Sequence, residues 1–448
     1  MGASARYGVH LTGQAPLNHR LLISFLSWRP GAFARDGARI FFWLGLRAAF
    51  QAVTVVLLAR WLGASGYGVF VAALAVASFF TPIAAMGMPA VLLRDGARHC
   101  DRLPWLLMRS LRLSLLAIIA CVIMATLAQR WSLPPSAPLW ALVFLAAGEI
   151  AGGAWTEIFA RTAQAKAQSH RFGAILAGLA AVRLSALLFL AALGPPTPCA
   201  WMLAFGLSSL VYVALLTLGA WPLLGHIKQA GFAPTTWKET GPAVREGFPF
   251  VTGALAFRLQ AEFNKPVLAH LGYAQAGAFS IAQRAVDFAA LPLAALQEAL
   301  WPRFFAAANP RQRAIRTGAL LVLLAAATGS ALALAAPLLP SLLGHDYQEA
   351  GQVLVWLALL PALQVCRNLG NAWLMALGYS HLLTVVYVLA AVAGVTSTLM
   401  WVPRYGLHGA MAAAYSGDLA AIFVQALALY GKSDASKTAD PCVRLNRE

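Results

Sequence analysis

Long apolar runs, separated by short polar connections, dominate the pattern of residues along the chain. Segments such as VFVAALAVASFF and LLVLLAAATGSALALAA are continuously apolar, whereas a transmembrane β-strand alternates polar and apolar positions. A helix needs about 20 predominantly apolar residues to cross the hydrocarbon core of a bilayer. The pattern therefore predicts membrane-spanning helices near residues 40–60, 67–88, 105–127, 139–160, 172–193, 199–224, 247–271, 277–300, 317–339, 351–377, 381–402 and 408–430.

Composition strengthens this interpretation, because 60% of the 448 residues are hydrophobic and only 11% are charged. Soluble domains usually contain about 25% charged residues. We therefore predict an all-α polytopic membrane protein with about twelve transmembrane helices.

The basic residues fall on alternate connections between these spans. On the side that holds both chain ends lie 24 of the 33 lysines and arginines, and six more lie inside predicted spans. Lys and Arg next to a span resist translocation, so both termini are predicted to be cytoplasmic. The net charge of +17 is then mainly an orientation signal, and it argues against a nucleic-acid partner.

The ends of the chain and its cysteines suggest little further chemistry. No cleavable signal peptide is recognised, and the segment LNHRLLISFLSW either lies along the inner membrane surface or is disordered. Five cysteines occur without CxxC spacing, so we predict neither a disulfide framework, nor a metal site, nor a cofactor.

An internal repeat with an offset of 209 residues superposes LGASGYGVF on LGYAQAGAF. The offset also maps Gln51 to Gln260 and Arg94 to Arg303. If the match is not a coincidence of an apolar composition, it predicts two six-helix lobes related by an axis along the membrane normal. The predicted divisions are a cytoplasmic tail (1–38), an N-lobe (39–224), a cytoplasmic linker (225–246), a C-lobe (247–430) and a second cytoplasmic tail (431–448).

Three stretches also carry a resemblance to a known family: ARWLGASGYGVFVAALAVASFFTPIAAMGMPAVLLRDGAR, LLGHDYQEAGQVLVWLAL and VPRYGLHGAMAAAYSGD. In order and spacing they resemble bacterial polysaccharide repeat-unit flippases of the multidrug/oligosaccharidyl-lipid/polysaccharide exporter superfamily. The resemblance implies two lobes around a central polar cavity. It also implies transport of an undecaprenyl-diphosphate-linked oligosaccharide from the cytoplasmic to the periplasmic leaflet, for export of a surface polysaccharide such as an O-antigen or exopolysaccharide.

The segment FRLQAEFNKP places Arg258, Glu262 and Lys265 inside a predicted span. Each ionised group at the bilayer centre costs about 2.5–3.5 kcal/mol on insertion scales, so such groups normally face a partner or water. Spacings of four and three residues put all three on one face of a continuous helix. They either form a ladder in which Glu262 neutralises both cations, or they line a cavity.

Similar polar residues occur in other spans. Arginine offers phosphate a planar fork of donors and lysine a mobile positive charge, which together suit a diphosphate. The predicted substrate-binding residues are Arg47, Gln51, Arg258, Lys265 and Arg284. Three carboxylates are assigned to ion coupling or charge pairing: Glu262, Asp287 and Asp418. Glu149 and Arg183 are interpreted as either a structural pair or cavity residues, and Arg367 as a residue near a helix end.

Two other functions remain as alternatives. A cation-coupled multidrug exporter of the same superfamily would share the fold, but its cavity should favour acidic residues. A membrane glycan polymerase or ligase usually needs a large outward catalytic loop, whereas the longest predicted outward loops span about eleven residues each. We therefore predict a transporter rather than an enzyme, whose partners are its lipid-linked substrate, membrane lipids and possible polysaccharide-assembly proteins.

Overall fold

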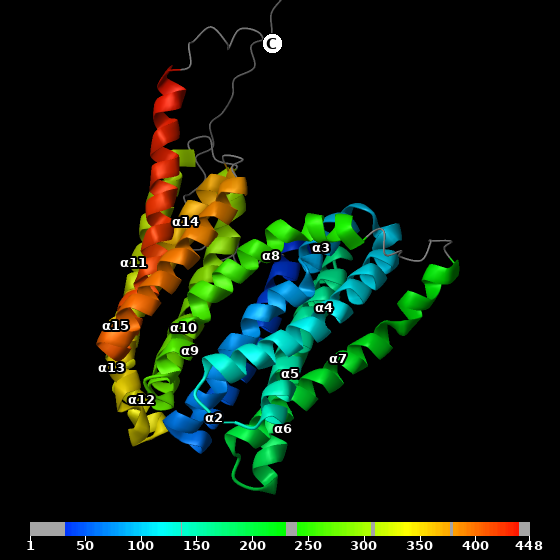
Figure 1. The fold of residues 1–448 in the computed structure, drawn as a ribbon. Coiled ribbons are helices and arrows are strands. Elements are labelled where there is room, and N and C mark those ends of the chain that lie inside the picture. The colour runs from blue at the N-terminus through cyan, green and yellow to red at the C-terminus, as the bar shows by residue number, and fades with distance from the viewer. Residues whose placement is uncertain (1–31, 136, 230–239, 306–309, 377–379, 439–448) are drawn as a thin grey trace, which may run out of the picture.

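The computed structural model describes residues 32–135, 137–229, 240–305, 310–376 and 380–438. The N-terminal segment LNHRLLISFLSW, for which the sequence leaves two alternatives open, lies outside these ranges, as do residues 230–239 of the linker and the last ten residues. The described residues form helices and no strand (Figure 1). The helices are α2 (Ala32–Ala85), α3 (Met88–Arg98), α4 (Leu103–Ser132), α5 (Leu139–Ala165), α6 (Ser169–Leu193), α7 (Pro198–Gln229), α8 (Thr240–Glu262), α9 (Asn264–Ala269), α10 (Tyr273–Phe305), α11 (Pro310–Ala335), α12 (Leu338–Leu343), α13 (Gln348–Leu357), α14 (Leu360–Ala376) and α15 (Ser380–Thr438), with short 3₁₀ turns η1 (Cys100–Arg102) and η3 (His345–Tyr347).

Seven helical segments of the described chain are long and apolar enough to cross a membrane, or eight if the bent pair α13–α14 is one span. Two of the seven are far too long for one crossing, and each is interrupted by a glycine with non-helical dihedral angles, Gly63 in α2 and Gly406 in α15. Each therefore supplies two spans. Together with α8–α9 and α10, whose polar residues make them less apolar, these account for the predicted twelve spans. The predicted all-helical polytopic fold is confirmed.

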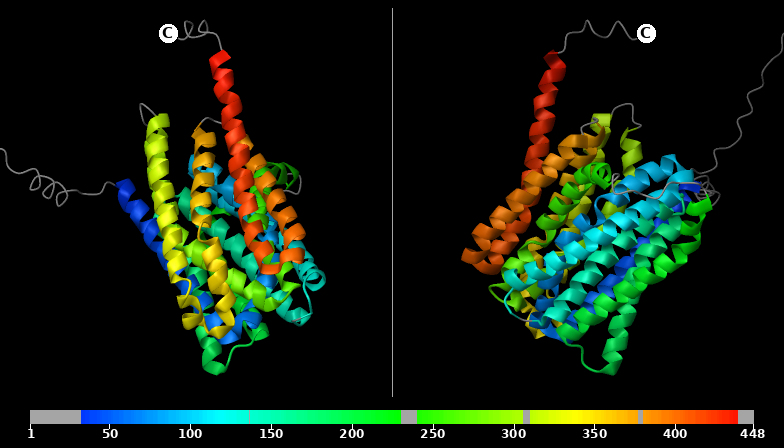
Figure 2. Two further views of the ribbon diagram at one scale, coloured as in Figure 1. Left: turned by 90° about the vertical axis from the view of Figure 1, so that its left-hand side faces the viewer. Right: turned by 45° about the vertical axis from the view of Figure 1, so that its right-hand side comes forward.

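The helices run between two ends of the bundle (Figures 1 and 2). We call the end at which α2 begins and α15 finishes the terminal end. The opposite end, which we call the far end, carries Gly63, Gly406 and the connections at 133–138, 194–197, 270–272 and 336–347. The described residues next to the basic connections predicted to be cytoplasmic, such as Arg94, Arg161 and Arg245, belong to the terminal end.

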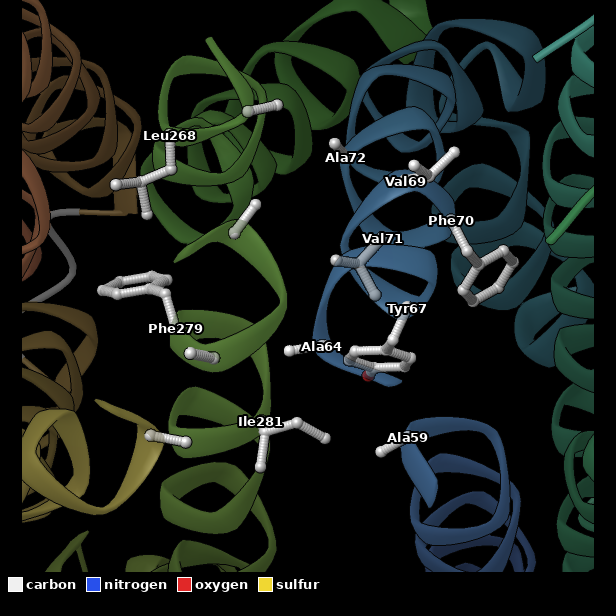
Figure 3. Close-up of a cluster of buried hydrophobic side chains, with 14 of the residues drawn as sticks. Ala59, Ala64, Tyr67, Val69, Phe70, Val71, Ala72, Leu268, Phe279 and Ile281 are labelled. Atoms are coloured by element: carbon white, nitrogen blue, oxygen red, sulfur yellow. The ribbon is translucent and has the colours of Figure 1, made fainter. Parts of the chain in front are cut away.

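The two lobes, α2–α7 and α8–α15, contact each other most closely where α2 crosses α10 near the far end (Figure 3). A Cβ atom on Gly68 would lie 1.7 Å from the carbonyl oxygen of Tyr273, and one on Gly277 would lie 2.2 Å from the carbonyl oxygen of Ala64. The offset of 209 residues maps Ala64 to Tyr273 and Gly68 to Gly277. The contact is therefore reciprocal, as an approximate two-fold axis between repeats requires. Only glycine permits so close an approach.

Further contacts close the far end between the lobes. A cluster of buried apolar side chains draws on both, including Tyr67 and Phe70 from α2 and Phe279 from α10 (Figure 3). The Tyr347 hydroxyl donates to the carbonyl of Ala59 (3.1 Å), in the last turn before the break at Gly63, where carbonyl groups lack helical partners. The hydroxyl of Tyr273 donates to the carbonyl of Pro134 (2.6 Å), which ties α10 to the connection after α4.

Helix α8 crosses from one lobe to the other (Figure 1). Near the terminal end, Gly247 packs so closely on the turn before α3 that a Cβ atom would lie 2.0 Å from the carbonyl oxygen of Met86. Arg94 of α3 also pairs with Glu246 of α8. Towards its other end, α8 contacts α15, where the Gln260 amide donates to Asp418 (2.9 Å). The start of α8 thus belongs with the first lobe and its end with the second.

Candidate functional site

A cavity of about 720 Å³ lies between the lobes. Its walls come from both segments of α2, from α3, α5, α6 and α7, and from α8 and α10 of the second lobe. It extends from Trp201 and Tyr67 near the far end to Leu93 and Arg161 near the terminal end. The charged and amide side chains that line it are Arg47, Gln51, Glu149, Glu157, Arg161, Arg183, Arg258 and Arg284.

Two of the arginines are neutralised on the wall of the first lobe. Arg161 and Glu157, one turn apart on α5, form an ion pair of 2.7 Å. Arg183 lies 3.4 Å from Glu149, donates to the hydroxyl of Ser209 (2.9 Å) and stacks over Phe205. The predicted pairing of Glu149 with Arg183 is therefore confirmed, and both residues also line the cavity.

Arg47 and Arg258 reach the same cavity from different lobes, because Arg47 lies on α2 and Arg258 on α8. Neither has a carboxylate within 4.0 Å in the part of the chain that the structure describes. Arg47 lies within electrostatic range of the carboxylates Glu157 and Glu149, which pair with other arginines, and of both Arg258 and Arg284. Gln51 follows Arg47 by one helical turn and lines the cavity beside it. These residues form a surplus of positive charge that faces the cavity.

The predicted span that holds Arg258, Glu262 and Lys265 is divided, so that Arg258 and Glu262 lie on α8 and Lys265 lies on α9. The helix is interrupted at Phe263, between α8 and α9. Pro266 is the physical reason, because it has no amide hydrogen to donate to the carbonyl of Glu262 four residues earlier. Arg258 lines the cavity, whereas Lys265 is only 2% exposed, pairs with Glu262 and is not among the lining residues.

Glu262 does neutralise two cations, but the second is Arg284 of α10 rather than Arg258. Glu262 Oε1 lies 3.7 Å from Nη2 of Arg284, and Glu262 Oε2 accepts a hydrogen bond from Nζ of Lys265. Arg284 lines the cavity; Glu262 does not. Asp287 follows Arg284 on α10 but is not a lining residue, and it has no cation within 4.0 Å among the described residues.

Asp418 belongs to a separate polar network inside the second lobe. It pairs with Arg367 of α14 and accepts a hydrogen bond from Gln260. Nearby, the amide of Gln425 donates to Asn371 (2.8 Å) and to the carbonyl of Arg367 (3.1 Å). Arg367 is 8% exposed, so the interpretation of this residue as one near a helix end that extends to water is wrong. None of these residues lines the cavity.

This buried pair gives a prediction about stability. The free energy of unfolding of the variant Asp418→Asn is expected to be about 3–5 kcal/mol lower than that of the wild type, because the charge of Arg367 stays buried without its counterion. Thermal unfolding of the purified protein in detergent measures the loss. The double variant Arg367→Met/Asp418→Leu should recover most of it, and Glu349→Gln, at an exposed carboxylate, serves as the control. Equal melting temperatures for Asp418→Asn and Glu349→Gln would contradict the prediction.

The part of the chain that the structure describes holds no group of three or more His, Cys, Asp or Glu side chains placed to bind a metal ion. Cys121, Cys199 and Cys366 are free thiols.

Comparison with known proteins adds a family and a fold. Residues 35–308 match the family described as "Polysaccharide biosynthesis protein", which is more than half of the chain. No curated protein matches the sequence.

Three solved structures with the same fold are informative. The inward-facing conformation of a multidrug resistance MATE family transporter of the MOP superfamily matches with a TM-score of 0.66 and 17% identity over 94% of this chain and 99% of that chain. The outward-facing conformation of such a transporter matches with a TM-score of 0.58 and 17% identity over 90% of this chain and 97% of that chain. Lipid II flippase MurJ, in an inward closed conformation, matches with a TM-score of 0.62 and 10% identity over 88% of this chain and 87% of that chain.

Proposed function

The chain belongs to the polysaccharide biosynthesis protein family, and from this premise we propose that it flips an undecaprenyl-diphosphate-linked oligosaccharide from the cytoplasmic to the periplasmic leaflet of the bacterial inner membrane. Family and fold together identify a membrane transporter of the MOP exporter superfamily. The substrate, the direction of transport and the cytoplasmic position of both termini belong to the proposal.

One observation carries the proposal: three arginines from both lobes face one cavity. Arg47, Arg258 and Arg284 all line it, and only Arg284 has a carboxylate within 4.0 Å among the described residues. Positive charges that repel each other are costly to hold together in a membrane unless an anion offsets them. A diphosphate supplies two negative phosphates whose oxygens accept forked hydrogen bonds from guanidinium groups. The other cationic residue of the predicted site, Lys265, would act from behind through Glu262.

The arrangement of the lobes supports an inward-open starting state. The far end is closed by the glycine crossing and the apolar cluster, whereas the cavity extends towards the terminal end. The positive-inside rule places the basic terminal end in the cytoplasm. The headgroup would enter from the cytoplasm while its lipid tail stays in the bilayer, and the lobes would then rock outward.

The membrane potential assists this direction of transport. Moving negative charge out of a negative-inside cell is favoured by about 2.3 kcal/mol per charge per 100 mV. Coupling to a cation through Glu262, Asp287 or Asp418 remains part of the proposal.

Multidrug export is the second candidate, because solved structures of MATE transporters share the fold. Purified protein in proteoliposomes separates the two functions. With a polyprenyl-diphosphate-linked oligosaccharide in one leaflet, we expect the glycan to become accessible to an added glycosidase from the other side faster than in protein-free vesicles. We expect no cation-driven accumulation of ethidium. The opposite pair of results would reject flipping in favour of drug export.

A further inference from the structure

The interruption between α8 and α9 lies beside the cavity and places charged side chains on both of its sides. Glu262 is the last residue of α8, and Lys265 lies one turn later on α9. The carbonyl of Glu262 has no helical donor, because residue 266 is proline. An interrupted spanning helix can bend where its hydrogen bonds are missing. The Glu262 side chain is thus attached to a point at which α8 can change direction.

The two oxygens of the Glu262 carboxylate have different partners. Oε2 is bonded to Lys265, whose side chain is 3% exposed and therefore committed to this contact. Oε1 lies 3.7 Å from Arg284, too far for a hydrogen bond, and the Arg284 side chain is 36% exposed. Arg284 therefore faces the cavity with its donors unused by Glu262, held only by charge attraction.

Electrostatics favours exchange of the partner of Arg284. Arg284 shares the cavity with Arg47 and Arg258, and the charge of Arg47 is repelled by both of the others. A diphosphate in the cavity would offer Arg284 short, charge-assisted hydrogen bonds in place of a contact of 3.7 Å. Lys265, which the cavity does not reach, would keep Glu262 charged and in position.

Building on the proposed function, we propose that Glu262 is the counterion that Arg284 exchanges for the diphosphate group of the substrate. In the empty state Glu262 attracts Arg284, and this attraction, together with a hydrogen bond from the Gln283 amide to the carbonyl of Ala261 (2.8 Å), holds the end of α8 on α10. Binding of a diphosphate transfers Arg284 to the ligand, which weakens this attachment and lets the end of α8 bend at Phe263. Glu262 is thus a positioning residue that links occupancy of the cavity to movement of the helix that crosses between the lobes.

The first test measures binding of inorganic pyrophosphate to the full-length protein in nanodiscs by calorimetry. Glu262→Gln should bind pyrophosphate at least about tenfold more tightly than the wild type, because Arg284 no longer has to leave a counterion. Its rate of glycan flipping should fall, because occupancy no longer changes the contact between α8 and α10. Asp287→Asn is the matched control: it removes the same charge near Arg284, from a carboxylate with no ion pair among the described residues. It should tighten binding much less.

If both variants bind pyrophosphate more tightly by the same factor, the tightening comes only from the loss of one negative charge, and the proposed exchange of Glu262 for the diphosphate is rejected. The proposal is also rejected if Glu262→Gln binds no more tightly than the wild type. Should Glu262→Gln fail to fold with Lys265 unpaired, Glu262→Gln/Lys265→Met removes both members of the buried pair and should still bind more tightly. Wild-type protein that binds no pyrophosphate would instead reject the proposed function itself.

A second test follows the helix. Spin labels at Gly253→Cys on α8 and Leu291→Cys on α10, both open to substitution, report the distance between the two helices in a chain whose native cysteines are serine. Pyrophosphate should change this distance in the otherwise wild-type chain. In Glu262→Gln the distance should already be changed without ligand. The proposal would be overturned if the distance were the same in both chains, the otherwise wild-type chain and Glu262→Gln, with and without pyrophosphate.

Discussion

The variant Arg47→Gln/Arg258→Gln is expected to bind pyrophosphate or a lipid-linked diphosphate about 100-fold more weakly than the wild type, and to lose flipping. A hydrogen bond to a charged group contributes about 1.5–3 kcal/mol, and 1.4 kcal/mol is a factor of ten, so two such contacts account for the loss. The two side chains lie on different lobes and face one cavity without a carboxylate within 4.0 Å in the described chain. Calorimetry in nanodiscs and the vesicle assay measure the two losses.

The fold should survive this change, because neither arginine holds an ion pair in the described structure. Glutamine is shorter than arginine but keeps a polar side chain that can hydrogen-bond in the cavity, so the melting temperature should change little. Arg60→Gln, on α2 but exposed and outside the cavity, is the matched control and should bind as the wild type does. The pair Arg47→Lys/Arg258→Lys should be intermediate, since lysine keeps the charge but lacks the planar fork of donors. Full transport by the double glutamine variant would show that the cavity is not the site of the headgroup.

The periodicity of apolar residues was sufficient to predict the architecture of the chain. Spans are long and continuously apolar, and a backbone in lipid has few alternatives to the helix. The sequence repeat aligns Gly68 with Gly277, and in the structure these two glycines make the reciprocal contact. The sequence could not predict that they touch, since the distance between the lobes depends on how both pack.

The site was harder to predict, because side chains in one span can face several different neighbours. The sequence predicts both Arg258 and Lys265 as cavity residues, yet only Arg258 lines the cavity, whereas Lys265 is buried in an ion pair with Glu262. Pro266 indicates the missing hydrogen bond between α8 and α9, but not which way either side chain faces. The sequence places Arg367 towards the end of the predicted span 351–377, but it does not show the counterion Asp418, which lies on α15. Pairings between distant helices leave no trace in one sequence.

Adding a side chain at the crossing of α2 and α10 should block transport by changing how the lobes pack rather than by changing the cavity. In the variant Gly68→Val, the new Cβ atom would lie 1.7 Å from the carbonyl oxygen of Tyr273. A backbone oxygen cannot escape by a change of rotamer, so the two helices must separate, and overpacking of this kind costs about 1–3 kcal/mol. The far end should then fail to close, and alternating access needs that closure.

Opening of the far end can be measured by the chemistry of a buried cysteine. Ala276, on α10 beside the crossing, is 0% exposed. In a chain whose native cysteines are serine, the Ala276→Cys thiol should react slowly with an impermeant maleimide added from the far-end side. Adding Gly68→Val should raise this rate and lower the rate of glycan flipping. Gly45→Val, also on α2 but with open space around it, is the matched control and should leave both rates unchanged.

The reciprocal contact between the two glycines adds a second requirement, because Gly277 should behave as Gly68 does. A Cβ atom on Gly277 meets the carbonyl oxygen of Ala64 at 2.2 Å, the counterpart of the contact at Gly68. Gly277→Ala and Gly68→Ala should therefore give similar rises in maleimide reactivity, smaller than that of Gly68→Val, even if the valine variant is too unstable to purify. Normal flipping in both alanine variants would mean that the lobes alternate without this contact, and that the far end is closed by its apolar cluster and tyrosine hydrogen bonds alone.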